Sequence, residues 1–232
     1  MSNPFSVDNI AFSVFGYQLS YVELFGTVFY LWSVWLIAKR RIWTWPVGIV
    51  SVLLFMMLFY QIRLYSDALE QVYYLGASIY GWWFWSHSPK EDGKILDVSF
   101  SSVVWLVVWA LLTALVGLSL GGFMSHAHDR FPVIFPEAAS YPYLDALTTI
   151  MSFTAMWLMA RRRIESWIYW IVVDVIGIGL YYAKAVKFVA LLYVILLFLA
   201  VKGFFSWLKT REQQKLDSTL KHNRRKNFVS LA

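Results

Sequence analysis

The sequence alternates between long apolar stretches and short polar segments. A helix needs roughly 20 apolar residues to cross the hydrocarbon core of a bilayer, and shorter helices are tolerated where neighbouring helices surround them. Seven stretches fit this requirement: 21–37, 45–60, 67–85, 101–120, 143–160, 167–182 and 185–207. The pattern therefore predicts an all-α integral membrane protein with seven transmembrane helices.

The segments between and beyond these stretches are polar. Residues 86–97 form a polar loop, and residues 121–142 form a longer loop with three prolines and, we expect, some interfacial structure. Residues 208–232 form a basic tail that we expect to be helical at first and then disordered. The first 20 residues have no basic n-region and no small-residue cleavage site, so we interpret them as mature protein.

The chain repeats itself at an offset of 122 residues, so that 21–85 recur without gaps as 143–207. The matching pairs include Trp45 with Trp167, Gly81 with Gly203, Trp85 with Trp207 and Glu23 with Asp145. Two unrelated apolar stretches would not share such residues at a fixed offset. The helix order is therefore 3+1+3 with two parallel units, a transporter architecture in which substrate binds between the repeats near the midplane.

Composition supports a membrane protein and removes several chemistries. The chain is 59% hydrophobic and only 15% charged, whereas soluble domains carry about 25% charged residues. Its 13 tryptophans and 14 tyrosines suit two membrane–water interfaces. There is no cysteine, which excludes disulfides, thiol catalysis, iron–sulfur clusters and thiolate zinc sites.

The placement of lysine and arginine predicts the orientation, because cytoplasmic loops of membrane proteins are enriched in both. With the N-terminus outside, 15 of these residues face the cytoplasm and four face outward. The domains are then an external segment 1–20, a first repeat 21–85, a linker 86–142 with a central helix 101–120 and an external loop, a second repeat 143–207 and a cytoplasmic tail 208–232. The net charge of +6 thus reflects orientation and not nucleic-acid binding.

Asp174 is the foremost functional candidate, because an ionisable side chain inside a membrane is costly and usually serves a function. It lies midway along 167–182, on the helix face that also presents Trp167, Trp170, Gly177 and Tyr181. Such a face suits a flat ligand that is cationic or rich in hydroxyl groups. The structural alternative is that the tryptophans pack or anchor the helix while Asp174 pairs with a neighbouring helix.

A second polar face runs along 67–85 and consists of Asp67, Gln71, Tyr74 and Ser78. The amide of Gln71 either hydrogen-bonds a ligand or joins two helices, and the sequence leaves both open. Thr149 and Ser152 are weaker ligand candidates, because such hydroxyl groups more often satisfy backbone carbonyls or hold helices together.

Three acids and one tryptophan have simpler interpretations. Glu23 and Asp145 begin equivalent helices, where an acid stabilises the helix N-terminus, and Glu70 lies on a different face from Gln71. Trp45 precedes a proline that suits the first helical turn, and it is a candidate either for stacking on a ligand or for anchoring.

No enzymatic or cofactor motif is present in the sequence. All four histidines lie in loops or the tail, and the His126–His128 pair is more readily a solvated loop than a metal site. No zinc-protease motif, nucleophile elbow or P-loop occurs. Lys184, Lys187 and Lys202 lie near the ends of the last helix, which disfavours a retinal protein. We therefore expect that the protein is not an enzyme and binds no cofactor. If it is a carrier, we expect it to work without ATP.

Several motifs together resemble the PnuC-type nicotinamide riboside transporters of bacterial inner membranes. The first unit contributes the segments 45–49, 64–68 and 80–83 together with Gln71 and Tyr74, and the second contributes Trp167, Trp170 and Asp174 followed by Tyr181. The similarity spans about 21–207. The W-x-x-W-x-x-x-[D/N] element is associated with substrate binding in this family, whose members often have Asn where this chain has Ser51.

The resemblance implies a SWEET-like parallel-repeat fold and facilitated diffusion of nicotinamide riboside, trapped in the cytoplasm by phosphorylation. It also implies a homotrimer in the inner membrane with one pathway per protomer. Two alternatives stay open: a related carrier of thiamine or riboflavin, and a membrane scaffold or sensor that recruits a partner through its basic tail. An intramembrane enzyme is a weaker third alternative.

Overall fold

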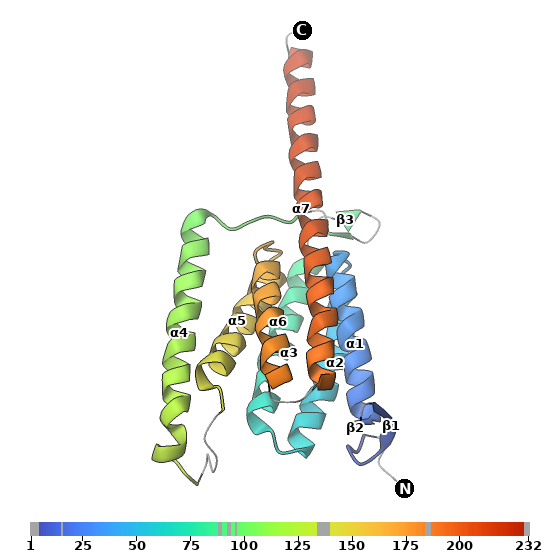
Figure 1. Ribbon diagram of the computed structural model, residues 1–232. Helices are drawn as coiled ribbons and strands as arrows, with labels where there is room; N and C mark the ends of the chain where they lie inside the picture. The colour runs from blue at the N-terminus through green and yellow to red at the C-terminus, as the bar shows by residue number, and fades with distance from the viewer. Residues whose placement is uncertain are drawn as a thin grey trace.

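The computed structural model describes residues 5–14, 16–87, 90–91, 94–95, 97–133, 140–183 and 187–229 (Figure 1). Its helices are α1 (Tyr21–Ala38), α2 (Thr44–Gln61), α3 (Tyr65–Ser86), α4 (Val103–Arg130), α5 (Pro142–Ala160), α6 (Ser166–Ala183) and α7 (Lys187–Val229). Four short strands form two hairpins, β1 (Ile10–Val14) with β2 (Tyr17–Ser20) and β3 (Lys90–Glu91) with β4 (Lys94–Ile95).

Each of the seven apolar stretches forms a helix, but two of these helices are longer than predicted. Helix α4 continues ten residues beyond 120, through two glycines that we expected to begin a loop. A Cβ atom at Gly121 would lie 2.9 Å from the backbone of Tyr143, so close packing against α5 requires a glycine there and offsets its low helix propensity. Residues 134–139 of that loop lie outside the described residues.

The tail departs from its prediction as well. Instead of becoming disordered, it continues α7 as one helix of 43 residues (Figure 1). Beyond Gly203 the segment contains neither glycine nor proline, and leucine, lysine, arginine and glutamine favour helix over most of its length.

Within the described part of the chain, five helices are long and apolar enough to cross a membrane, namely α1, α2, α4, α6 and α7. Helices α3 and α5 fall short because polar residues interrupt them. A membrane helix with such residues has to turn them toward other helices.

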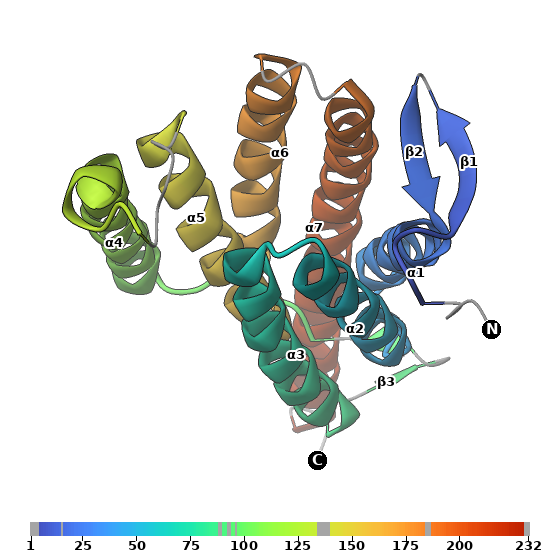
Figure 2. The ribbon, with the colours of Figure 1, turned by 90° about the horizontal axis from the view of Figure 1, so that it is seen from below.

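Six of the helices form a ring, in which α1, α2, α3, α5, α6 and α7 each contact the next and α7 contacts α1 (Figure 2). Helix α4 lies outside this ring against α5. We call the end of the bundle near β1 and β2 the hairpin end, and the end from which α7 projects the tail end (Figure 1).

The packed core lies at the tail end around four tryptophans, Trp45, Trp85, Trp167 and Trp207, which we call the tryptophan tetrad. Trp45 meets Trp85 edge-on at 5.3 Å between ring centroids, and Trp167 meets Trp207 edge-on at 5.6 Å. The four side chains are at most 2% exposed. Buried aromatic area of this size makes the tetrad a major source of stability for the bundle.

The tetrad also joins the two halves of the chain. The indole N–H of Trp85 donates to the carbonyl of Ala160 at the end of α5, and that of Trp207 donates to the carbonyl of Ile37 near the end of α1. Each half therefore binds the end of the first helix of the other half.

The turns that follow α1 and α5 have the same backbone conformation. Arg40 and Arg162, which are 122 residues apart, have φ angles of 56° and 61°. In each turn the N–H of the arginine and that of the next residue return to carbonyls of the last helical turn, as in a left-handed helix cap.

A short strap, residues 97–101, crosses the second of these turns. Ser99 pairs with Arg163 as an isolated β-bridge, and the buried carboxylate of Glu165 accepts the backbone N–H of Ser101 at 3.1 Å. Asp97 forms an ion pair with Arg162 at 3.1 Å. Burial lowers the pKa of the Arg162 guanidinium, and this carboxylate opposes the shift.

At the hairpin end, side chains hold the N-terminal segment. Gln61 accepts the backbone N–H of Val7 and donates to the carbonyl of Phe5. The phenol of Tyr17 donates to Glu23 at 2.6 Å, and burial together with this carboxylate raises the pKa of Tyr17. Ser20 caps α1 by accepting the N–H of Glu23. Glu23 therefore supports the start of α1, as its position predicted.

Candidate functional site

Polar side chains from five helices meet in the half of the ring toward the hairpin end. We call this group the polar cluster: Tyr30, Asp67, Glu70, Gln71, Tyr74, Asp145, Thr149, Ser152, Asp174, Tyr181 and Tyr193. It includes six of the nine residues that the sequence nominated for ligand contact. The tryptophan tetrad lies at the opposite end, so polar and apolar parts of the interior are separated.

Helices α3 and α5 supply one side of the cluster and are joined by side-chain hydrogen bonds. The hydroxyl of Thr149 donates to Glu70 at 3.2 Å, and Tyr74 and Ser152 share a hydrogen bond. The phenol of Tyr73 donates to the carbonyl of Phe153 at 2.7 Å. Thr149 and Ser152 therefore join the two helices, the role that the sequence favoured for them, while bordering the cluster.

Helices α6 and α7 supply the opposite side, through two tyrosines. The rings of Tyr181 and Tyr193 stack at 5.3 Å between centroids, and their phenols share a hydrogen bond. A Cβ atom at Gly177 would lie 2.5 Å from the ring of Tyr193, so that ring lies directly on the α6 backbone. The glycine of the predicted α6 face thus makes room for an aromatic wall.

Asp174 belongs to the α6 side of the cluster and is only 3% exposed. It interacts electrostatically with Tyr30 of α1 and Tyr193 of α7. Within the described residues no hydrogen-bond or ion-pair partner of its carboxylate is found. A buried carboxylate without a partner is costly and calls for an explanation.

Gln71 presents the same situation on α3. Its side chain is 8% exposed, and the part of the chain that the structure describes supplies no hydrogen bond to its amide. By helical register it shares a face with Asp67 and Tyr74. Of the two interpretations of Gln71, joining two helices therefore receives no support.

The three tryptophans nominated by the sequence lie elsewhere. Trp45 covers Gly81 and Trp167 covers Gly203, where a Cβ atom would come within 2.4 and 2.5 Å of the indole rings. The structure thus does not bring these two residues to Asp174. Trp170 is partly buried and packs against the tetrad, one helical turn from Asp174.

Five members of the cluster were not nominated as ligand contacts from the sequence: Tyr30, Asp67, Glu70, Asp145 and Tyr193. Glu70 was assigned to a different face, and Asp145 was assigned to the helix N-terminus. The 122-residue offset relates Tyr30 to Ser152 and Tyr193 to Gln71. Both tyrosines are therefore the repeat counterparts of predicted site residues.

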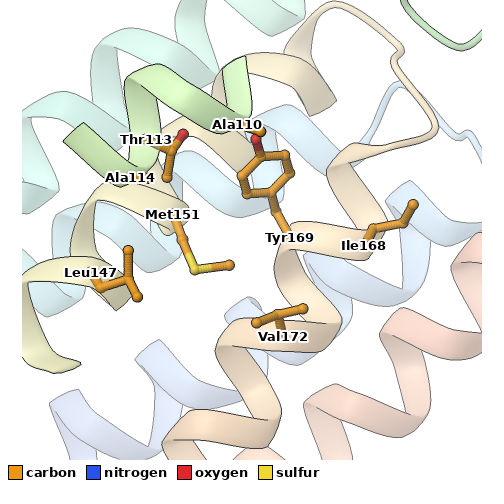
Figure 3. Close-up of a pocket in the computed structure, with 8 residues that line it drawn as sticks. All are labelled: Ala110, Thr113, Ala114, Leu147, Met151, Ile168, Tyr169 and Val172. Atoms are coloured by element: carbon orange, nitrogen blue, oxygen red, sulfur yellow. The ribbon is translucent and has the colours of Figure 1, made fainter. Parts of the chain in front are cut away.

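A separate apolar groove of about 260 Å³ lies on the outside of the ring, between α4, α5 and α6 (Figure 3). Met151, Tyr169 and Val172 point into it, and Thr113 lies at its edge. It contains none of the acids of the polar cluster. Within the described residues no group of histidines and acids could hold a metal ion.

Ser51, which stands where the resembling family often has asparagine, is already engaged. Its hydroxyl donates to the carbonyl of Gly26 at 2.9 Å and is fully buried. It therefore joins α2 to α1 in this structure.

Known proteins resemble the chain over most of its length. The nicotinamide riboside transporter PnuC of Escherichia coli is 28% identical over 229 residues, covering 90% of this chain and 96% of that protein. The riboflavin/roseoflavin transporter RibM of Streptomyces davaonensis is 28% identical over 208 residues, covering 88% of this chain and 93% of that protein.

A solved structure, described as the crystal structure of the vitamin B3 transporter PnuC, has the same fold. It matches with a TM-score of 0.64 at 23% sequence identity and covers 84% of this chain and 83% of that one. The profile of the nicotinamide mononucleotide transporter family matches residues 20–209, which include α1 to α6, α7 as far as residue 209 and the complete polar cluster. The chain belongs to the nicotinamide mononucleotide transporter family.

Proposed function

We propose that the protein takes up nicotinamide riboside across the bacterial inner membrane by facilitated diffusion. Membership of a transporter family makes it a multi-pass membrane transporter and not an enzyme. The observation that supports this substrate best is the presence, among tyrosines, of two buried polar side chains, Asp174 and Gln71, for which the described residues supply no hydrogen-bond partner.

The chemistry of the ligand complements this pair. Nicotinamide riboside combines a flat, positively charged pyridinium ring with a hydroxylated ribose. The Asp174 carboxylate balances a positive charge or accepts hydrogen bonds from hydroxyl groups, and the Gln71 amide both donates and accepts. Tyrosine rings such as Tyr193 and Tyr30 offer faces to a cationic ring.

The proposed membrane arrangement has seven spanning helices in the 3+1+3 order, with the hairpin end outside and the tail end in the cytoplasm. Support comes from the equivalent contacts at an offset of 122 residues, above all the two tryptophans over two glycines and the two arginine turns. The excess of basic residues at the tail end supports the same orientation.

In this arrangement the tryptophan tetrad closes the cytoplasmic end while the polar cluster faces the outside. Within the described residues, the indole N–H groups of Trp45 and Trp167 have no hydrogen-bond partner. We therefore keep both residues, with Trp170, as proposed contacts of a substrate that leaves toward the cytoplasm, where their N–H groups would find acceptors. Phosphorylation in the cytoplasm would then prevent its return, and the functional unit would be a homotrimer.

A related vitamin is the second candidate, because one relative is a riboflavin/roseoflavin transporter at a similar identity. Riboflavin is uncharged, so it would leave the carboxylate of Asp174 without compensation. Thiamine is cationic and aromatic and is the more serious competitor. The polar cluster thus favours a cationic ligand.

A binding panel tests the proposal. Calorimetry on the purified protein should detect nicotinamide riboside and neither thiamine nor riboflavin at comparable affinity. Asp174→Asn should weaken binding about tenfold to a hundredfold, because it removes a charge-assisted contact. Glu23→Gln is the matched control, since this acid is bound to Tyr17 outside the cluster, and it should bind normally. Equal affinities of Asp174→Asn and the wild type would remove Asp174 from the site.

A further inference from the structure

The N-terminal hairpin of β1 and β2 exposes large apolar side chains although it lies outside the helices. Ile10 is 40% exposed and Phe12 is 47% exposed, and Phe5 in the segment before β1 is exposed as well. Asp8 is the only charged side chain among residues 1–20. Exposed apolar side chains that gather on one segment mark a contact with another protein or with a membrane.

The hairpin is fixed to the bundle, so these side chains have a defined position relative to the helices. The phenol of Tyr17 donates to Glu23 of α1 at 2.6 Å. The backbone N–H of Tyr21 donates to the carbonyl of Asn9 at 3.0 Å. Gln61 at the end of α2 holds the backbone of the segment before β1.

The length of α1 places the hairpin at the surface of the bilayer. This helix is apolar enough to cross a membrane and has 18 residues. It is therefore about 27 Å long, close to the hydrocarbon thickness of about 30 Å. Because β2 ends at Ser20 and α1 begins at Tyr21, the hairpin lies at the level of the lipid headgroups.

The outer face of α1 leads directly to the hairpin. Large apolar residues at spacings of three and four are exposed along this helix, namely Tyr21, Phe25, Val28, Trp32 and Trp35. In a multi-pass membrane transporter such a stripe faces lipid. The hairpin contacts α1 and lies beside it, outside the ring of helices (Figure 2). It therefore continues the lipid-facing surface and does not cover the centre of the ring.

We propose that the N-terminal hairpin is an interfacial membrane anchor, whose apolar side chains Ile10, Phe12 and Phe5 insert into the lipid leaflet at the hairpin end. Since residues 1–20 contain no lysine or arginine, the contact rests on burial of apolar surface and needs no anionic lipid. The family profile begins at residue 20, so almost all of the anchor lies outside it. The proposal does not depend on which vitamin is carried.

Single-cysteine labelling tests the anchor, because the chain contains no cysteine of its own. Phe12→Cys is the test position. Ser13→Cys is the matched control, since Ser13 is also exposed and neighbouring strand residues point to opposite faces. Val28→Cys, in the middle of the α1 stripe, marks lipid contact. Ile10→Cys repeats the test if the label at position 12 disturbs the fold, which thermal unfolding detects.

Each variant of the full chain is spin-labelled and reconstituted into phosphatidylcholine vesicles. Electron paramagnetic resonance then measures collisions of the label with oxygen, which concentrates in lipid, and with a nickel chelate, which stays in water. We expect the oxygen-to-nickel ratio at position 12 to be severalfold higher than at position 13 and lower than at position 28. Adding phosphatidylglycerol to the vesicles should not change the ratio at position 12.

Three results would overturn the anchor. Equal ratios at positions 12 and 13 would place the hairpin in water. Low accessibility to both reagents at position 12, with broadening by a second label, would show that another copy of the chain covers it. A rise in the ratio only with phosphatidylglycerol would contradict an apolar contact. None of these results bears on substrate binding, so the proposed function is tested separately.

Discussion

Two glycine residues lie directly beneath indole rings. Gly81 on α3 and Gly203 on α7 each leave room for an indole ring, and any larger residue would overlap it. Gly76 on α3 and Gly179 on α6 differ from them, because no atom lies within 4 Å of the position that a Cβ would occupy there. Alanine substitutions at the two pairs of glycines should therefore have different effects on stability.

We expect Gly81→Ala and Gly203→Ala each to destabilise the protein by about 1 to 3 kcal/mol, because the added methyl group would displace a fully buried tryptophan. Gly76→Ala should be neutral or stabilising by up to about 1 kcal/mol, since alanine favours helix. Thermal unfolding in detergent measures both. Equal melting temperatures for Gly81→Ala and Gly76→Ala would show that the ring does not resist displacement.

At the residue scale, the sequence identified what was chemically unusual and missed what was ordinary. Asp174 stood out because a charge in an apolar helix is rare, and Gln71 because it follows a recognisable face. Tyr30 and Tyr193 were missed because a tyrosine in an aromatic-rich helix attracts no attention. Trp45 and Trp167 were nominated by their type, but only coordinates reveal the glycines beneath them.

Helix ends join the two three-helix units. The carbonyls of Ile37 and Ala160 lie at the ends of α1 and α5, where a helix leaves carbonyl groups without intrahelical donors. The indole of Trp85 donates to Ala160, and that of Trp207 donates to Ile37, which also accepts the backbone N–H of Arg40. Both tryptophans are completely buried, so neither bond competes with water.

Trp207→Phe and Trp85→Phe should each lower the free energy of unfolding by about 1 to 3 kcal/mol, because each variant loses a buried hydrogen bond to a carbonyl at a helix end. Trp43→Phe is the control, since this side chain is 67% exposed and should change little. Chemical or thermal denaturation of the purified variants provides the measurement. Similar losses for Trp43 and Trp207 would argue against the role of the two bonds.

At the element scale, the helix positions could be predicted because an apolar stretch of about 20 residues forms a helix when it crosses a bilayer. The C-terminal ends of α4 and α7 could not be predicted. Paired glycines and nearby prolines suggested a loop after residue 120, whereas Gly121 is required by the approach of Tyr143. The tail was expected to become disordered from its charge, although its residues favour helix once α7 is nucleated.

The whole molecule ends in a projecting basic helix, part of which belongs to the bundle. Thr210 is buried, and the guanidinium of Arg211 lies 4.8 Å from the ring centroid of Phe100 in the strap. Residues beyond these, such as Leu216 and Leu220, are exposed. The boundary between transporter and appendage therefore lies a few residues after Arg211.

A truncation after Ser218 should leave uptake of nicotinamide riboside into proteoliposomes unchanged, whereas a truncation before Thr210 should reduce it, because the second removes contacts with the strap. A scaffold that recruits partners through its tail would lose its activity in both cases. Uptake assays on the two truncated proteins, reconstituted at equal amounts, distinguish these outcomes.

The strap at residues 97–101 has a mechanical consequence. It is bonded to the turn at Arg163 and Glu165 and leads directly into α4, which packs on α5. The second unit is thereby braced at the tail end, whereas within the described residues the strap forms no such bond with the matching turn of the first unit. If the two units rock against each other during transport, we expect the second to act as the stationary frame and the first as the moving arm.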